Sequence, residues 1–242
     1  KYPIIIDQEG GRVNRLNRFI ALDQFTPEYF GKLFTSNKKQ FNLIYKLFID
    51  KISFFLSNLG ININTIPVLD LFYKGSSNII GDRSYSKDPK VVSKIGDICI
   101  ESLKKNSIGS VIKHIPGHGL AKVDSHFFTP SINKPLDFLK KRDFIPFKNK
   151  NTLFAMTAHV IYKKIDPHNT VTHSKKMIKI IRNQIKFKNI IISDDLSMKS
   201  LKYSLKENTI KAFAAGCNLA LHCNGNLIEM CIVAKNSPKL NS

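Results

Sequence analysis

The chain has 242 residues, 43% of them hydrophobic, and a formal net charge of +20 at pH 7. This length fits one domain and comes close to the roughly 250 residues of a closed α/β barrel, and the ordinary apolar content excludes wholesale disorder. The 38 lysines and arginines are scattered along the sequence and form no single arm or stripe, which argues against nucleic-acid binding.

Short apolar runs alternate along the chain with stretches of helical periodicity. In the first half, the pattern predicts strands at 2–6, 65–69 and 109–112 and helices at 41–59 and 89–105. In the second half, we expect strands at 153–156, 189–192 and 218–221 and helices at 174–185, capped by Ser174, and 210–215. The segments 75–78 and 115–130 are predicted loops, and the second is long enough to be a functional loop.

Six such strands separated by helices predict a parallel sheet with crossover helices. A doubly wound open sheet and a closed barrel both satisfy the pattern, but the placement of polar residues favours the barrel. Only a barrel gathers all its strand ends around one mouth, and seven polar residues sit at or just past strand ends: Asp7, Asp70, Lys113, His114, His159, Asp194 and His222. We therefore predict one TIM-type (β/α)8 barrel domain over residues 1–242. Lys1 is not a natural start, so we expect the first strand–helix unit to be missing.

No apolar run approaches the roughly 20 residues that cross a bilayer, so we expect no membrane association. The four cysteines, Cys99, Cys217, Cys223 and Cys231, have no Cys-x-x-Cys spacing. In a chain of this size they are typical of reduced core thiols, which is consistent with a reducing compartment such as the cytoplasm.

Three of the seven histidines fall between His114 and His126. Asp124 and His126 are two residues apart in the predicted loop, where a carboxylate can orient and charge an imidazole for proton transfer near neutral pH. A lone Asp-x-His is usually a solvated loop or a capping contact. This one follows a strand end that carries Lys113 and His114, which favours a functional role.

Two further segments carry acidic residues directly after a predicted strand. Asp194 and Asp195 follow the run 190–192; Asp195 can cap the following helix, while Asp194 is better placed to face the barrel mouth. At the N-terminal end, residues 7–15 bring Asp7 and then Arg15, whose guanidinium can fork onto an oxygen-rich ligand. Glu9 and Arg12 in the same segment could equally form a structural ion pair.

These segments together resemble glycoside hydrolase family 3, specifically its bacterial single-domain β-N-acetylhexosaminidases. The resemblance rests on blocks in matching order at residues 7–12, 113–119, 124–126 and 193–198, with two shorter blocks at 81–84 and 156–159. It covers residues 4 to about 225, and Leu120 departs from it where many relatives place a polar residue.

The resemblance implies roles for particular residues. Asp194 becomes the nucleophile of a retaining hydrolysis, with His126 as acid/base and Asp124 as its partner. Residues of the sugar-binding subsite are then Asp7, Arg15, Arg83, Lys113 and His114. The implied substrate is terminal, non-reducing β-linked N-acetylglucosamine, in a glycan or in peptidoglycan (muropeptide) fragments of cell-wall recycling. No cofactor, metal, nucleic acid or membrane is implied, and we expect a monomer.

Three other interpretations stay open. A metal-dependent hydrolase could use His114, His118, Asp124 and His126 as ligands, although Lys113 would then lie beside the cation. A β-glucosidase of the same family is a second possibility, and the His–Asp pair favours the N-acetylglucosaminidase branch over it. The third is a catalytically impaired, truncated relative retained for binding or scaffolding.

Overall fold

The structure, a computed structural model, describes residues 2–123 and 128–239. Its main sheet has six strands that all pair in parallel: β1 (Ile5–Ile6), β2 (Ile63–Asn64), β3 (Gly109–Ile115), β5 (Phe154–Thr157), β7 (Ile190–Asp195) and β8 (Leu219–Leu221). The strand order β1-β2-β3-β5-β7-β8 follows the chain without reversal. A doubly wound sheet reverses its order at a switch point, whereas a barrel keeps one direction.

The sheet is therefore part of a barrel. Among the described residues no pairing joins β1 to β8, so the curled sheet is open between these two edge strands. This confirms the predicted TIM-type α/β architecture with part of the barrel lacking. A separate two-stranded sheet of β4 (Ser131–Ile132) and β6 (Ile161–Tyr162) was not predicted.

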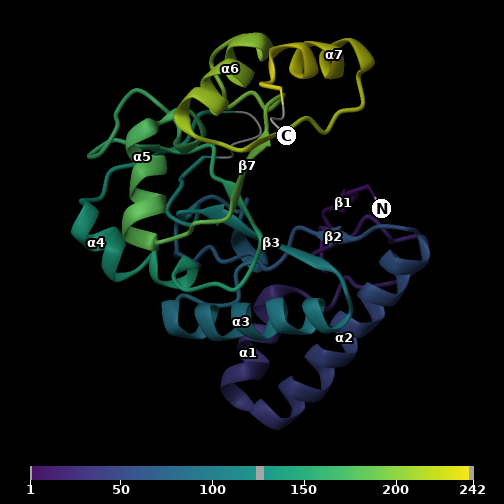
Figure 1. Cartoon of the computed structure of the whole chain (residues 1–242). Helices are drawn as coiled ribbons and strands as arrows, with labels where there is room; N and C mark the ends of the chain where they lie inside the picture. The colour runs from purple at the N-terminus through teal and green to yellow at the C-terminus, as the bar shows by residue number, and fades with distance from the viewer. Residues whose placement is uncertain (1, 124–127, 240–242) are drawn as a thin grey trace.

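Helices surround the outside of the sheet and follow each other in chain order (Figure 1). They are α1 (Pro27–Ser36), α2 (Lys38–Asn58), α3 (Pro89–Lys105), α4 (Leu136–Lys141), α5 (Lys175–Ile180), α6 (Leu205–Ala215) and α7 (Leu227–Asn236). A π-helical turn at Ile181–Ile185 extends α5, and 3-10 turns lie at Gly81–Arg83, Ile145–Phe147 and Val171–His173. This placement is the expected result of right-handed crossovers between neighbouring parallel strands.

Helix starts follow local capping chemistry. Asp88 accepts a hydrogen bond from the backbone N–H of Lys90, and Pro89 occupies the first helical position, where its missing N–H costs nothing. The predicted cap Ser174 is confirmed, because its side chain accepts from the N–H of Met177. Such caps fix where each crossover helix begins and therefore where the preceding loop can lie.

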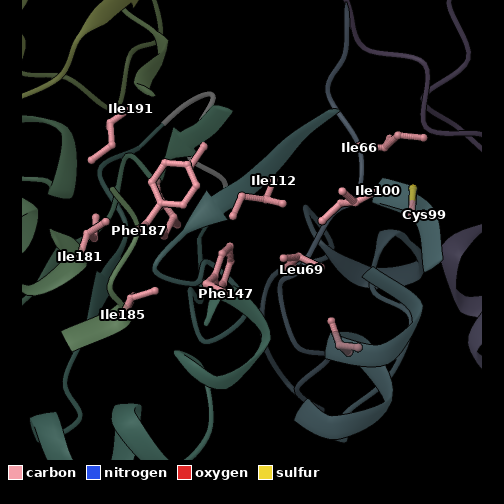
Figure 2. Packing of buried hydrophobic residues seen from close by; sticks show 14 of the residues in the cluster. Ile66, Leu69, Cys99, Ile100, Ile112, Phe147, Ile181, Ile185, Phe187 and Ile191 are labelled. Carbon is pink, nitrogen blue, oxygen red and sulfur yellow. The ribbon is translucent and has the colours of Figure 1, made fainter. Parts of the chain in front are cut away.

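One continuous hydrophobic cluster fills the space between sheet and helices. Ile112 of β3 is fully buried and lies between two groups of side chains, one around Cys99 and Ile100 of α3 and one around Phe187 and Ile191 (Figure 2). At about 25 cal/mol per Å² of apolar surface removed from water, such burial is the main force that holds the helices on the sheet.

The predicted strand at 65–69 is displaced in the structure. Ladder pairing occurs at Ile63–Asn64 instead, and Val68 makes only an isolated bridge with Lys113. The reason is Pro67, which has no N–H to donate to a ladder. Extended chain still runs beside β3, since the N–H of Leu69 donates to the carbonyl of Lys113 at 2.7 Å.

The structure also bears on the cysteines and on membrane-spanning helices. Cys99 and Cys217 are buried free thiols as predicted, but Cys223 and Cys231 are exposed, so the prediction of core thiols is wrong for these two. In the described part of the chain, no helix combines the length and apolar character of a bilayer span.

Candidate active site

A cavity of about 130 Å³ opens at the carboxyl ends of the strands. It brings together all the predicted site residues that the structure describes, namely Asp7, Arg15, Arg83, Lys113, His114 and Asp194. The remaining lining residues are Glu9, Val13, Ile79, Ile80, His118, Met156 and Met198. The lining thus combines charged and apolar side chains, a combination suited to a small polar ligand with a hydrophobic face.

Lys113 is one of the charged lining residues, and its side chain is only 3% exposed. Its ammonium donates to Oδ1 of Asp7 at 2.9 Å and to Oγ1 of Thr65 at 2.7 Å, and it lies 2.6 Å from Oε1 of Glu9. Burial lowers the pKa of Lys113, but the two carboxylates outweigh it and raise the pKa above its usual value. Lys113 therefore stays positively charged, and it holds the pKa of Asp7 well below its usual range.

Glu9 is a site residue that the sequence did not identify as one. Its buried carboxylate accepts from Arg83 through two hydrogen bonds of 2.8 Å and also contacts Lys113. Burial raises the pKa of Glu9, yet Arg83 and Lys113 bring it down to about 2. The suggested Glu9–Arg12 pair is wrong, because Arg12 instead bonds Asp82 at 2.9 Å.

Asp70 is the second residue without a predicted role, although its place at a strand end had been noted. Its carboxylate lies 2.6 Å from Nδ1 of His114 and accepts from the backbone N–H of His118 at 2.6 Å. Burial raises the pKa of Asp70, but the neighbouring His114 and His118 lower it overall. One buried carboxylate thus orients the His114 imidazole and holds the backbone of His118.

Asp194 projects from the end of β7 into the cavity. Its Oδ1 accepts from the backbone N–H of Asp195 at 2.8 Å. Burial raises the pKa of Asp194, but the surrounding imidazoles of His159 and His114, that N–H and Lys113 together lower it. The carboxylate is therefore ionised at neutral pH, as a nucleophile must be.

Asp195 has a different environment from its neighbour. Its carboxylate accepts from the Ser197 hydroxyl at 2.7 Å and from the Cys223 backbone N–H at 3.2 Å. The predicted cap is thus a turn cap, since the next helix, α6, begins only at Leu205.

His159 contacts the backbone at this end of β7. Its Nε2 lies 3.0 Å from the carbonyl oxygen of Asp195, and its Nδ1 lies 2.7 Å from Oγ1 of Thr172. Because a carbonyl can only accept, Nε2 carries the proton and Nδ1 accepts from the threonine. Burial lowers the pKa of His159, so the neutral ring that these bonds require is the stable form.

The predicted acid/base His126 and its partner Asp124 lie outside the described residues. Asp124 and His126 are also two of the four residues of the alternative metal-ligand set, so that set is only half described. Across 2–123 and 128–239, no group of three or more His, Cys, Asp or Glu side chains is arranged to hold a metal ion.

Residues 2–239 match the family model described as "Glycosyl hydrolase family 3 N terminal domain". A beta-hexosaminidase of Actinobacillus pleuropneumoniae serotype 5b is 34% identical over 233 residues, which are 93% of this chain and 66% of that protein. A beta-hexosaminidase of Nitrosomonas eutropha is 33% identical over 91% of this chain and 64% of its own length. The chain therefore spans about two thirds of the length of these curated relatives.

Solved structures agree on the fold. NagZ from Neisseria gonorrhoeae, in complex with N-trifluoroacetyl-D-glucosamine, has a TM-score of 0.84 and 30% identity over 96% of this chain and 67% of its own. A glycosyl hydrolase of the same family from Mycobacterium smegmatis has a TM-score of 0.85 over 97% of this chain and 71% of its own; at 24% identity it supports the fold alone.

Proposed function

Because the chain belongs to glycosyl hydrolase family 3, we propose that it is a retaining β-N-acetylhexosaminidase that removes terminal, non-reducing N-acetylglucosamine. Three observations support the proposal. Relatives matched over more than 90% of this chain bear the name beta-hexosaminidase, and a neighbouring structure binds a glucosamine derivative. The cavity of this chain is also lined by an ionised carboxylate, Asp194, together with several cations.

Asp194 is the proposed nucleophile, and its environment is the observation that carries the proposal. The carboxylate is half-buried, lines the cavity and has a lowered pKa, although desolvation by itself raises that pKa. In a retaining glycosidase, such a group attacks the anomeric carbon as the bond from that carbon to the leaving oxygen breaks, which leaves a glycosyl ester on the enzyme.

The sugar subsite is proposed to consist of Asp7, Arg15, Arg83, Lys113 and His114. Lys113 and Arg83 are held in place by Glu9 and Asp7, so little reorganisation is needed when sugar hydroxyl groups bind. Arg15 is the exception, because its side chain is 60% exposed and 4.0 Å from Asp7. It is free to move onto a ligand from the rim.

His126 is proposed to protonate the leaving oxygen, with Asp124 raising the proportion of protonated imidazole. The neutral ring would then take a proton from water while the water oxygen attacks the anomeric carbon. This second step releases the sugar with its original configuration and restores the Asp194 carboxylate. No cofactor enters either step.

The proposed natural substrates are peptidoglycan (muropeptide) fragments in cell-wall recycling, acted on in the cytoplasm by a monomer. This part of the proposal comes from the family resemblance. Scattered basic charge, and not a single basic patch, supports the exclusion of nucleic acid as a partner.

A panel of aryl β-glycosides tests the activity. All members carry the same leaving group and differ only at the 2-position of the sugar, which bears either an acetamido or a hydroxyl group. We expect the acetamido sugar to be hydrolysed roughly 100-fold faster, in keeping with what differential binding of one group achieves. Faster turnover of the glucoside would favour a β-glucosidase, and no turnover of either would favour the impaired relative.

A further inference from the structure

The carboxyl group of Asp143 lies buried outside the cavity lining, just after α4. It is 2% exposed, and its Oδ2 accepts from the hydroxyl of Tyr73 at 3.0 Å. In the described residues no ion pair joins Asp143 to a cation. Arg142, the neighbouring residue, turns instead onto Tyr73, with Nε 3.3 Å from its hydroxyl and the guanidinium 5.5 Å from the ring centroid.

The Asp143 side chain packs against Gly117, in the turn that follows β3. A Cβ added to Gly117 would lie 3.1 Å from Cβ of Asp143 and 3.6 Å from its Oδ1. Gly117 has a φ of +137°, a conformation that side-chain-bearing residues rarely adopt. Its carbonyl accepts from the hydroxyl of Tyr162, so this peptide is held from two sides.

Gly117 lies between the two histidines that line the cavity. Its N–H donates to the carbonyl of His114 at 2.7 Å, and His118 follows it directly. Asp70 bonds the His114 ring and the backbone N–H of His118, so the turn is held both by Asp70 and by the contacts of Asp143 and Tyr162 with Gly117. A movement at Gly117 therefore displaces both imidazoles.

We propose that Asp143 is a positioning residue: tied to Tyr73, its carboxyl group supports Gly117 and through it fixes His114 and His118 in the cavity. The inference rests on the proposed function insofar as the histidines serve hydrolysis. It assigns Asp143 no contact with the sugar.

Because Asp143 can change its charge, its effect on activity should depend on pH, which a purely structural role would not produce. Burial, and to a smaller extent the nearby Asp70, raise the pKa of Asp143 to about 7, although the Tyr73 hydroxyl and Arg142 act to lower it. Tyr162, on the remaining side, has a hydroxyl whose pKa is itself raised well above its usual value by burial. Asp143 is thus neutral in acid, and raising the pH through about 7 places an anion near Asp70.

Two replacements of Asp143 separate support from charge. Asp143→Asn keeps the shape, the acceptor for Tyr73 and the neutral state, whereas Asp143→Ala removes the support. At pH 6 we expect Asp143→Ala to displace the imidazole NMR signals of His114 and His118 and to lower kcat/KM about 10- to 100-fold, the effect of an ångström-scale misplacement. Asp143→Asn should match wild type at pH 6 and lose less activity than wild type between pH 6 and 8.5.

Asp137→Asn is the matched control, because Asp137 lies on α4 with its side chain 87% exposed. Unmoved imidazole signals in Asp143→Ala would overturn the inference, as would an Asp143→Asn enzyme as impaired at pH 6 as Asp143→Ala. If Asp143→Ala does not fold, Tyr73→Phe replaces it, and its imidazole signals must move. An inactive wild type would refute the proposed function, while the NMR signals would still decide the positioning role.

Discussion

The carboxylate of Glu9 accepts two hydrogen bonds from the guanidinium of Arg83, each 2.8 Å long, across 74 residues of sequence. Both side chains are largely buried, at 0% and 12% exposure, and Lys113 adds a second cation to the same carboxylate. Glu9 thus holds two positive charges of the cavity lining, Arg83 and Lys113, in place.

Replacement of Glu9 by glutamine should therefore destabilise the protein. Glutamine keeps the shape but leaves Arg83 and Lys113 buried with Asp7 as their remaining anion. Breaking a buried ion pair by removing one partner costs about 3–5 kcal/mol, and we expect a loss of this order in the free energy of unfolding. Urea-induced unfolding at pH 7 measures it.

Glu28→Gln is the control for the Glu9 replacement. Glu28 pairs with Lys32 at 2.8 Å on the surface of α1, where the two side chains are 48% and 73% exposed. Such pairs contribute at most about 1 kcal/mol. Equal losses in the two variants would contradict the role given to Glu9.

The adjacent carboxylates Asp194 and Asp195 should respond differently to the same change. Asp194→Asn removes the proposed nucleophile and should lower kcat by roughly three orders of magnitude or more, as the loss of a group acting in covalent catalysis does. Asp195→Asn weakens the turn bonds to Ser197 and Cys223 and should lower thermal stability while folded enzyme keeps most of its turnover. Steady-state kinetics with an aryl N-acetylglucosaminide decide the matter. Similar kcat losses in both variants would refute the assignment.

Much of the site was predictable because of a property of parallel strands. Lys113, His114 and Asp194 follow or end apolar runs, and the carboxyl ends of such strands share one edge, so their convergence could be expected from spacing alone. Arg83 lies in a 3-10 turn and Arg15 in an irregular segment. No periodicity places those two. Only the family resemblance indicated Arg83, whereas the ability of a guanidinium to fork onto an oxygen-rich ligand had already drawn attention to Arg15.

The sequence could not reveal which side chains of the site pair with each other. Glu9 binds Arg83 and not Arg12, and Asp70 binds a histidine 44 residues away; such contacts are set by tertiary packing. The helices α1, α4 and α7 were not predicted. For two of them the reason is local: α4 has only six residues and α7 buries only Val233, so neither displays a clear apolar stripe.

A buried histidine outside the cavity, His173, should make stability sensitive to acid. The Nε2 of His173 lies 3.2 Å from the carbonyl of Asn208, and burial lowers the pKa of His173 to about 4, helped by His159 and Lys211. A folded-state pKa below the ordinary 6.5 means that the unfolded chain binds a proton first as the pH falls. Stability is therefore lost between pH 6.5 and about 4.

The replacement His173→Gln isolates this contribution. Glutamine can still donate to the Asn208 carbonyl but does not titrate, so the thermal midpoint of wild type should fall more steeply than that of the variant as the pH goes from 7 to 4. Melting curves at half-unit pH intervals measure the difference. Parallel curves for the two proteins across this window would contradict the buried, neutral state of His173.

Close packing at Gly119 should make the active-site turn intolerant of even one methyl group. A Cβ at Gly119 would come 1.9 Å from the carbonyl oxygen of Leu71, which is backbone and cannot rotate away. Leu71 directly follows Asp70, so relief of the clash separates Asp70 from His118. Overpacking of this kind costs about 1–3 kcal/mol, and we expect Gly119→Ala to lose stability and to lower kcat/KM.

Gly75→Ala separates this clash from a general effect of replacing glycine. Gly75 has a φ of +81° but no atom within 4 Å of an added Cβ. Alanine there meets only left-handed backbone strain, about 1–2 kcal/mol. The two variants should therefore lose comparable stability, but only Gly119→Ala should lose activity at temperatures where both are folded. Normal kcat/KM in folded Gly119→Ala would mean that the contact between the turn and Leu71 does not hold His118 in its working position.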